Sequence, residues 1–155
     1  MEFKPPFIDV TYHREDFQIK ERSDGTKEKI TVRKRPGTVG ICAAIMNRFK
    51  VDAVPHLICG GFNRQETEDA LIDLQFLGID NVLALRGDPI KFEGNFIPKV
   101  GGYSYASELV SQIKDMNNGI YVEEDLLNPA PTHFCIGVAA YPEMHMDASS
   151  LGADM

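Results

Sequence analysis

The tripeptide Arg86-Gly87-Asp88 is the most specific chemical signal in the sequence. It follows an apolar run over 81–85 and precedes Pro89, so we expect it at the carboxyl end of a buried strand. A glycine between opposite charges lets a flat ligand approach the backbone, with a cation and a carboxylate at the ligand's edge. A surface turn with a local ion pair explains the same residues, and the pattern alone leaves both interpretations open.

Other polar side chains also stand within or directly after apolar runs. His56 interrupts the run over 54–59, where a core histidine bonded to a backbone carbonyl is the simpler interpretation and a ligand contact is the alternative. Tyr141 and His145 follow the run over 134–140, although a capped turn explains them nearly as well. These positions are therefore candidates rather than assignments.

Several common catalytic motifs are absent from the sequence. It contains neither G-x-G-x-x-G nor G-x-x-x-x-G-K-[ST], which excludes a Rossmann dinucleotide-binding motif and a P-loop. It also lacks C-x-x-C, H-E-x-x-H and G-x-S-x-G, so zinc hydrolases and α/β-hydrolases have little support. Cys42, Cys59 and Cys135 lie far apart within apolar segments, which predicts reduced thiols with neither a disulfide nor a zinc site.

The elements that must position these residues alternate along the chain. Strands are expected over 7–12, 54–59, 81–85 and 134–140. Helices are expected from Thr38 as the capping residue to Phe49, from the capping residue Asn63 to a stop at Gly78, and from Ser104 to a stop at Gly119. The predicted helical face of the first includes Val39, Cys42, Ala43, Met46 and Phe49.

This alternation predicts an α/β fold of parallel βα units. The expected strands lack polar alternation, so we expect them to be buried on both faces and joined by right-handed crossovers. A doubly wound sheet and a (β/α)8 barrel both fit, since both place their sites at the carboxyl ends of the strands.

One segment departs from the βα pattern. Apolar and polar residues alternate on both sides of Asp24-Gly25, which predicts a β-hairpin near residues 17–36. We expect the Asp-Gly pair to supply the positive φ values of a tight hairpin turn. Five cations lie between Lys27 and Arg35, but the strand alternation and the hairpin turn favour a solvated hairpin over a phosphate site.

Composition limits the classes of partner. The 155 residues carry 16 Lys+Arg against 23 Asp+Glu, a formal charge of -7, so nucleic-acid binding and anionic-membrane binding are disfavoured. No apolar run approaches the roughly 20 residues that cross a bilayer, and the N-terminus has no signal-peptide pattern. We therefore expect a cytoplasmic protein without a membrane or nucleic-acid partner.

Five ordered motifs of this sequence resemble methylenetetrahydrofolate reductase, the flavoprotein family that reduces 5,10-methylenetetrahydrofolate to 5-methyltetrahydrofolate. The motifs are Val10-Thr11-Tyr12, Pro55-His56-Leu57-Ile58-Cys59, the segment from Gly78 to Pro89, Tyr105-Ala106-Ser107-Glu108-Leu109-Val110, and the segment from Val138 to His145. The family is a (β/α)8 TIM barrel that binds FAD at the carboxyl ends of its strands, so the resemblance implies a barrel. The hairpin near 17–36 has no match in the general pattern.

The resemblance also implies roles for individual residues. Asp88 would contact both FAD and folate, and its negative charge would stabilise the iminium cation to which the hydride is transferred. Thr11 would lie beside the flavin and the nicotinamide donor NAD(P)H. The other implied FAD contacts are Tyr12, His56, Arg86, Gly87, Ala106, Tyr141, His145, Ala148 and Asp154. His145 is followed by Met146 where the family has proline, which affects the expected loop geometry.

By resemblance the chain matches about strands two to five of the barrel, so we expect residues 1–155 to form a single incomplete TIM-barrel domain. Glu2 is not expected to be the family's general acid, because Thr11 follows too closely for an intervening helix. We therefore expect this chain alone to be inactive and to form a homo-oligomer. The alternatives are a noncatalytic, self-associating half-barrel and, less favoured by the motifs, another flavin barrel such as a proline dehydrogenase.

Overall fold

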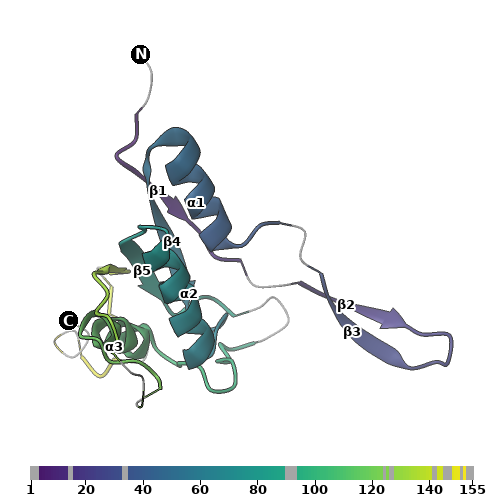
Figure 1. The fold of residues 1–155 in the computed structure, drawn as a ribbon. Coiled ribbons are helices and arrows are strands. Elements are labelled where there is room, and N and C mark those ends of the chain that lie inside the picture. Colours follow the sequence, from purple (N-terminus) through teal and green to yellow (C-terminus); the bar gives the residue numbers. More distant parts are fainter. Residues whose placement is uncertain are drawn as a thin grey trace.

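A parallel four-stranded sheet forms the centre of the computed structural model, which describes residues 4–13, 16–32, 35–89, 94–123, 125, 128–140, 143–144, 148–150 and 152 (Figure 1). Its strands lie in the order β1 (Phe7–Val10), β4 (Asp52–Ile58), β5 (Asn81–Leu85) and β6 (Cys135–Val138). All three neighbouring pairs are parallel, which confirms the predicted α/β fold with parallel βα units. The spatial order follows the chain order, whereas a doubly wound sheet reverses at a switch point.

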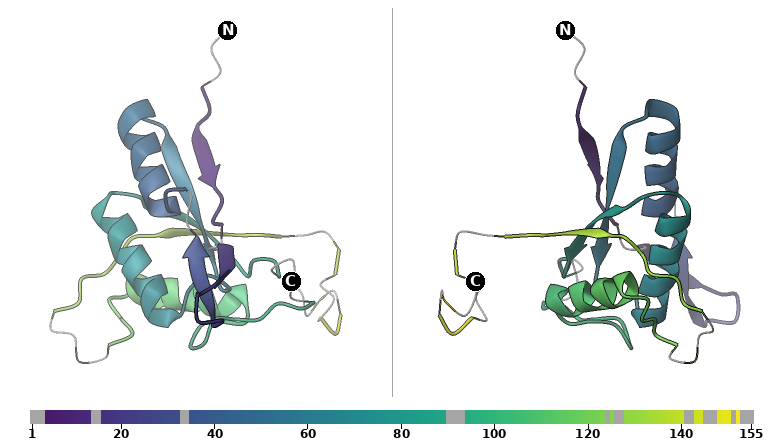
Figure 2. Two further views of the ribbon diagram at one scale, coloured as in Figure 1. Left: turned by 90° about the vertical axis from the view of Figure 1, so that its right-hand side faces the viewer. Right: turned by 60° about the vertical axis from the view of Figure 1, so that its left-hand side comes forward.

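Three helices cover one face of this sheet (Figure 2). They are α1 (Thr38–Phe49), α2 (Arg64–Phe76) and α3 (Ala106–Asn117). The core between helices and sheet consists of fully buried apolar side chains, among them Leu71, Leu74, Leu109, Ile113 and Met116 from the helices and Ala53, Leu57, Val82 and Ala84 from the strands. Burial of this continuous apolar layer is the main source of stability.

The opposite face of the sheet, called the open face below, is less buried. In β4, Pro55 and Leu57 are buried against the helices, whereas Val54 and His56, which alternate with them along the strand, are only partly buried. In β5 the buried residues likewise alternate with partly buried ones. The prediction of burial on both faces is therefore wrong for the described part of the chain, because its helices pack on one face only.

The β-hairpin is confirmed, with β2 (Asp16–Glu21) antiparallel to β3 (Lys27–Val32). It projects away from the helices and the four-stranded sheet (Figure 1). Gly25 has φ +80°, but Asp24 does not share a positive φ, so the prediction for the turn is half wrong. The hydrogen bond from Arg22 N to Thr26 O closes a three-residue loop, in which only the last residue must be left-handed.

The ends of α2 follow the sequence prediction. The side chain of Asn63 accepts a hydrogen bond from Glu66 N, and the Glu66 carboxylate accepts one from Asn63 N, which is a complete capping box. Gly78 ends the helix with φ +70°, and Gly119 has the corresponding φ of +78° after α3.

The starts of the other two helices differ from the prediction. Gly37 is the capping residue of α1, and Thr38 is its buried first residue. Helix α3 begins at Ala106 rather than Ser104, because the Glu108 carboxylate accepts hydrogen bonds from the backbone N–H groups of Ser104 and Tyr105. Phe49, predicted on the buried face of α1, is 69% exposed because it lies in the last turn.

Candidate functional site

The loops after β1 and β4 pack together through aromatic rings. The ring of Tyr12 lies 4.8 Å from that of Phe62, centroid to centroid, at an interplanar angle of 51°. A Cβ added to Gly61 would lie 2.7 Å from Tyr12 Cε1, so the tyrosine ring needs the glycine backbone beside it. Thr11, directly after β1, is exposed at the same end of the sheet.

The loop that carries Arg86, Gly87 and Asp88 is held against β4 and the residues that follow it. Gly60 N donates a hydrogen bond to Arg86 O at 3.4 Å. Gly87 has φ +84°, and a Cβ there would lie 3.2 Å from Cβ of Ile58. Both the left-handed backbone conformation and the tight contact therefore favour glycine between the two charged residues. Asp88 is exposed, and the Arg86 guanidinium lies 5.5 Å from the centroid of the Phe96 ring.

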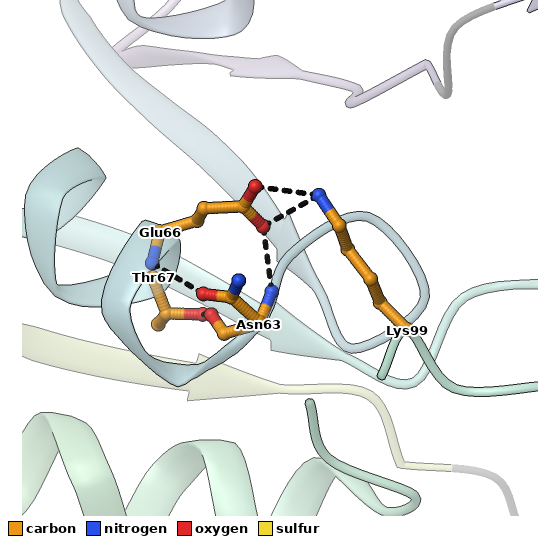
Figure 3. A network of polar contacts seen from close by, with 4 residues as sticks. All are labelled: Asn63, Glu66, Thr67 and Lys99. Carbon is orange, nitrogen blue, oxygen red and sulfur yellow. Dashed lines mark hydrogen bonds and ion pairs between the residues drawn. The ribbon is translucent and has the colours of Figure 1, made fainter. Parts of the chain in front are cut away.

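An ion pair fixes the later part of this loop to the start of α2 (Figure 3). Lys99 Nζ lies 2.7 Å from Oε2 of Glu66, the carboxylate that also completes the capping box with Asn63. The hydrogen bond from the Lys99 ammonium is the main reason why the pKa of Glu66 lies below its ordinary value. Nearby, a Cβ on Gly102 would lie 2.5 Å from the carbonyl oxygen of Phe62, so this contact also requires glycine.

His56 lies on the open face of β4, opposite Leu83 of β5. Its side chain is 15% exposed, and its Nε2 atom is buried with no hydrogen-bond partner among the described residues. The nearest ionisable partner of Nε2 is the Asp9 carboxylate, with Oδ1 at 3.9 Å, beyond hydrogen-bond distance. A buried polar atom without a partner is unusual in a folded protein and marks a position where a group is able to bind.

The start of α3 brings a further predicted residue to the loop after β5. Ala106 is the partly buried first residue of the helix. Tyr103 lies just before it, with the Arg64 guanidinium 5.2 Å from the ring centroid. Burial raises the pKa of the Tyr103 hydroxyl, so this group stays protonated at neutral pH.

Cys59 stands next to these loops, but it is not a nucleophile. Its thiol donates a hydrogen bond to Leu85 O at 3.5 Å, and burial raises its pKa to about 11. The thiolate is therefore scarce at neutral pH. Among the described residues there is no group of three or more His, Cys, Asp or Glu side chains able to hold a metal ion. Within the same residues no helix is long and apolar enough to span a membrane.

The structure thus brings several predicted residues together and leaves others apart. Thr11, Tyr12, His56, Arg86, Gly87 and Asp88 come from three adjacent strands or the loops after them, with Ala106 beyond the loop after β5. Ala148 is partly buried, and no hydrogen bond between described residues joins it to this group. The predicted residues Tyr141, His145 and Asp154 lie outside the described residues, as does Glu2.

Sequence reasoning missed residues that support this group. Phe62 and Phe96 supply rings against Tyr12 and Arg86, and Asp9 lies beside His56. Of these residues, only Asp9 could have been found from the sequence. Strand alternation places its side chain on the same face as that of the candidate residue Thr11. The aromatic contacts depend on loop packing between distant segments, which local patterns do not encode.

The arrangement suits a flat, partly polar ligand at the carboxyl ends of β1, β4 and β5. The aromatic rings offer apolar surface, and the Gly87 backbone lets a ligand approach closely because it has no side chain. Arg86 and Asp88 supply charge, and the buried His56 Nε2 atom is able to form a hydrogen bond. Pockets for planar cofactors generally combine these features.

Known proteins share this sequence pattern. A family model described as methylenetetrahydrofolate reductase matches residues 1–155. The chain is 34% identical over 140 residues to methylenetetrahydrofolate reductase 1 of Schizosaccharomyces pombe, covering 90% of this chain and 18% of that protein. It is 30% identical over 154 residues to 5,10-methylenetetrahydrofolate reductase of Pectobacterium carotovorum, covering 98% of this chain and 39% of that protein. The chain therefore spans less than half the length of these relatives.

Proposed function

The chain belongs to the methylenetetrahydrofolate reductase family, and we propose that its residues form part of a flavin-dependent domain that reduces 5,10-methylenetetrahydrofolate to 5-methyltetrahydrofolate. The observation that carries the proposal is the convergence of His56 with Arg86-Gly87-Asp88 at one end of three adjacent parallel strands. Ends of parallel strands are where α/β enzymes hold their cofactors.

FAD is the cofactor that these residues fit. The orphaned Nε2 of His56 and the glycine-lined approach at Gly87 suit the polar edge and the flat ring system of a flavin. When bound, FAD would accept a hydride from NAD(P)H and later pass it to the folate. Thr11 and Tyr12 would border the ring, with Thr11 also near the nicotinamide donor, and Ala106 would line the same pocket. We assign Tyr141, His145, Ala148 and Asp154 to the adenosine and diphosphate portion.

Asp88 would act on both the cofactor and the folate substrate. It is exposed at the end of β5, and the adjacent Gly87 leaves no side chain on the backbone beside it. A carboxylate held there favours positive charge on the folate, which is the charge that develops when the one-carbon unit becomes an iminium cation. Its role is electrostatic and requires no proton transfer to or from Asp88.

The sheet order supports a barrel as the complete architecture. The strands follow one another without reversal and carry helices on one face only, as an arc of a (β/α)8 barrel does. The partly buried open face would then point to the barrel interior. On its own, the 155-residue chain is expected to bind FAD at most weakly and not to turn over substrate, since by resemblance the family's general acid is on a strand that its residues do not match. The cytoplasm is the compartment that suits the three free cysteines.

A noncatalytic, self-associating half-barrel is the second candidate. It is favoured by exposed apolar residues on the two outer strands, with Phe7 of β1 at 51% and Val138 of β6 at 55% exposure. Unpaired outer strands readily pair with another copy. A homo-oligomer is compatible with either candidate, so flavin binding must be measured together with molecular mass.

A titration of FAD with the purified chain tests the proposal. Quenching of flavin fluorescence is expected to saturate, and Asp88→Ala and His56→Ala should each weaken binding by tenfold, or about 1.4 kcal/mol. His133→Ala and Asp73→Ala are matched controls, because both side chains are exposed and lie outside the site. The proposed site is refuted if the wild type shows no saturable binding, or if all four variants bind FAD as tightly as the wild type. A discrete dimer that does not bind FAD would favour the second candidate.

A further inference from the structure

Asp9 and His56 form a pair on the open face of the sheet. Asp9 of β1 lies opposite Val54 of β4, so His56, two residues further along, is on the same face. The distance from Asp9 Oδ1 to His56 Nε2 is 3.9 Å. The Nε2 atom is buried and has no hydrogen-bond partner in the described part of the chain, whereas the Asp9 side chain is 53% exposed.

The remaining neighbours of His56 on the sheet offer Nε2 no other ionic partner. Leu83, the residue opposite it on β5, has no polar side-chain atom. Asp52 shares the open face of β4, but it lies at the other end of the strand, opposite Phe7. Leaving a buried hydrogen-bonding group unmet is more costly than a small rotation of an exposed aspartate side chain toward it.

We propose that Asp9 is a positioning residue that accepts a hydrogen bond from the Nε2–H of His56 and thereby fixes the tautomer of the imidazole. In the neutral ring, a proton on Nε2 leaves Nδ1 as a hydrogen-bond acceptor. His56 would then present an acceptor to a ligand N–H group rather than a donor to a ligand oxygen. The identity of that ligand as the flavin rests on the proposed function, whereas the pairing of Asp9 with His56 does not.

The tautomer can be measured directly. Long-range ¹H–¹⁵N correlation of the ¹⁵N-labelled chain, at a pH where His56 is neutral, should show the proton on Nε2 in the wild type. Asp9→Ala should move the population toward the Nδ1-protonated form, since Nε2 then lacks an acceptor. Asp9→Asn keeps an acceptor oxygen and should restore the wild-type tautomer. Asp52→Ala removes a carboxylate from the same face and should change nothing. An Nδ1-protonated wild type, or an unchanged tautomer in Asp9→Ala, overturns the proposal.

Flavin affinity gives a second readout. Asp9→Ala should weaken FAD binding by about tenfold, the low end of the effect seen when a metal-binding histidine loses the partner that orients it, with recovery in Asp9→Asn. If the wild type binds no FAD, the proposed function fails and the tautomer still decides the role of Asp9. If the wild type binds FAD while Asp9→Ala leaves the tautomer unchanged, only the role of Asp9 fails.

Discussion

Lys99 and Glu66 join the loop after β5 to the start of α2, at a distance of 2.7 Å between Nζ and Oε2. Glu66 belongs to the first turn of α2 and completes a capping box with Asn63, whereas Lys99 comes from the loop after β5. The same loop contains Phe96, the ring beside the Arg86 guanidinium. One carboxylate thus stabilises a helix start and holds a loop of the site (Figure 3).

Glu66→Gln should lower stability in a pH-dependent way. Because the pKa of Glu66 is lowered in the folded state, its ionised form adds stability above its ordinary value of 4.5, and this contribution is lost as the pH falls through the lowered folded pKa. Near neutral pH we expect a loss of less than about 1 kcal/mol, since the pair is partly exposed and glutamine still caps the helix. Urea unfolding at pH 7 and at successively lower pH measures the difference.

The wild type and Glu66→Gln should converge at acid pH, where the protonated carboxyl resembles the amide. Asp73→Asn removes an exposed carboxylate from the same helix and is the matched control, with an expected change within about 0.5 kcal/mol at every pH. A Glu66→Gln deficit that stays constant down to acid pH contradicts the argument.

Gly87→Ala and Gly40→Ala should have opposite effects on stability. At Gly87 a Cβ meets Ile58 at 3.2 Å and φ is +84°, so we expect a loss of about 1–3 kcal/mol together with weaker FAD binding. At Gly40, inside α1, a Cβ meets nothing within 4 Å, so alanine should add about 0.5–1 kcal/mol. Denaturant unfolding measures both values. A neutral Gly87→Ala variant with normal FAD affinity would show that this loop conformation is dispensable.

Local sequence patterns predicted the helices and strands, because the residues that start or end an element lie within a few positions of that end. The Asn63 cap, with Glu66 three residues later, and the Gly78 stop were readable within a few positions and are confirmed. The start of α3 was misplaced, because the Glu108 side chain reaches back to the backbone of Ser104 and Tyr105. This capping contact depends on the rotamer of the Glu108 side chain, which cannot be read from the sequence.

The burial of the sheet was harder to predict. Apolar runs such as 81–85 fit burial on both faces, yet Leu83 and Leu85 on the open face are only partly buried. In this strand, the solvent exposure of successive side chains therefore alternates, whereas their residue types do not alternate between apolar and polar. For the site, the positions of His56 and Gly87 followed from strand ends, whereas the Tyr12–Phe62 and Lys99–Glu66 contacts join residues 50 and 33 positions apart in the sequence.

The three cysteines should differ sharply in reactivity toward iodoacetamide. Cys135 is exposed, whereas burial raises the pKa values of Cys42 and Cys59 to about 11. We expect one adduct per native chain at pH 8, by intact-mass measurement, and three after denaturation. Cys135→Ser should abolish the native adduct. Rapid native modification of Cys59 would mean that its surroundings open in solution.

Asn117→Ala should lower stability, because one amide links α3 to the segment that leads into β6. Its Nδ2 donates to Phe134 O, and its Oδ1 accepts from Phe134 N, both at 2.9 Å, and from Thr132 Oγ1 at 2.7 Å. Alanine leaves all three groups unpaired beside the buried Phe134 ring, so a loss of about 2–3 kcal/mol is expected in urea unfolding. Asn118→Ala is the matched control.

Within the residues that the structure describes, the exposed Asn118 side chain donates to Lys114 O alone, so its replacement should cost less than about 1 kcal/mol. Hydrogen exchange distinguishes local from global loss. If the amide of Asn117 holds β6 in the sheet, the protection of the Cys135 N–H, which donates to Asp80 O at 2.7 Å, should fall more in Asn117→Ala than that of the β4 amides. Equal losses of protection in both strands would instead indicate that Asn117 stabilises the whole domain and not the attachment of β6.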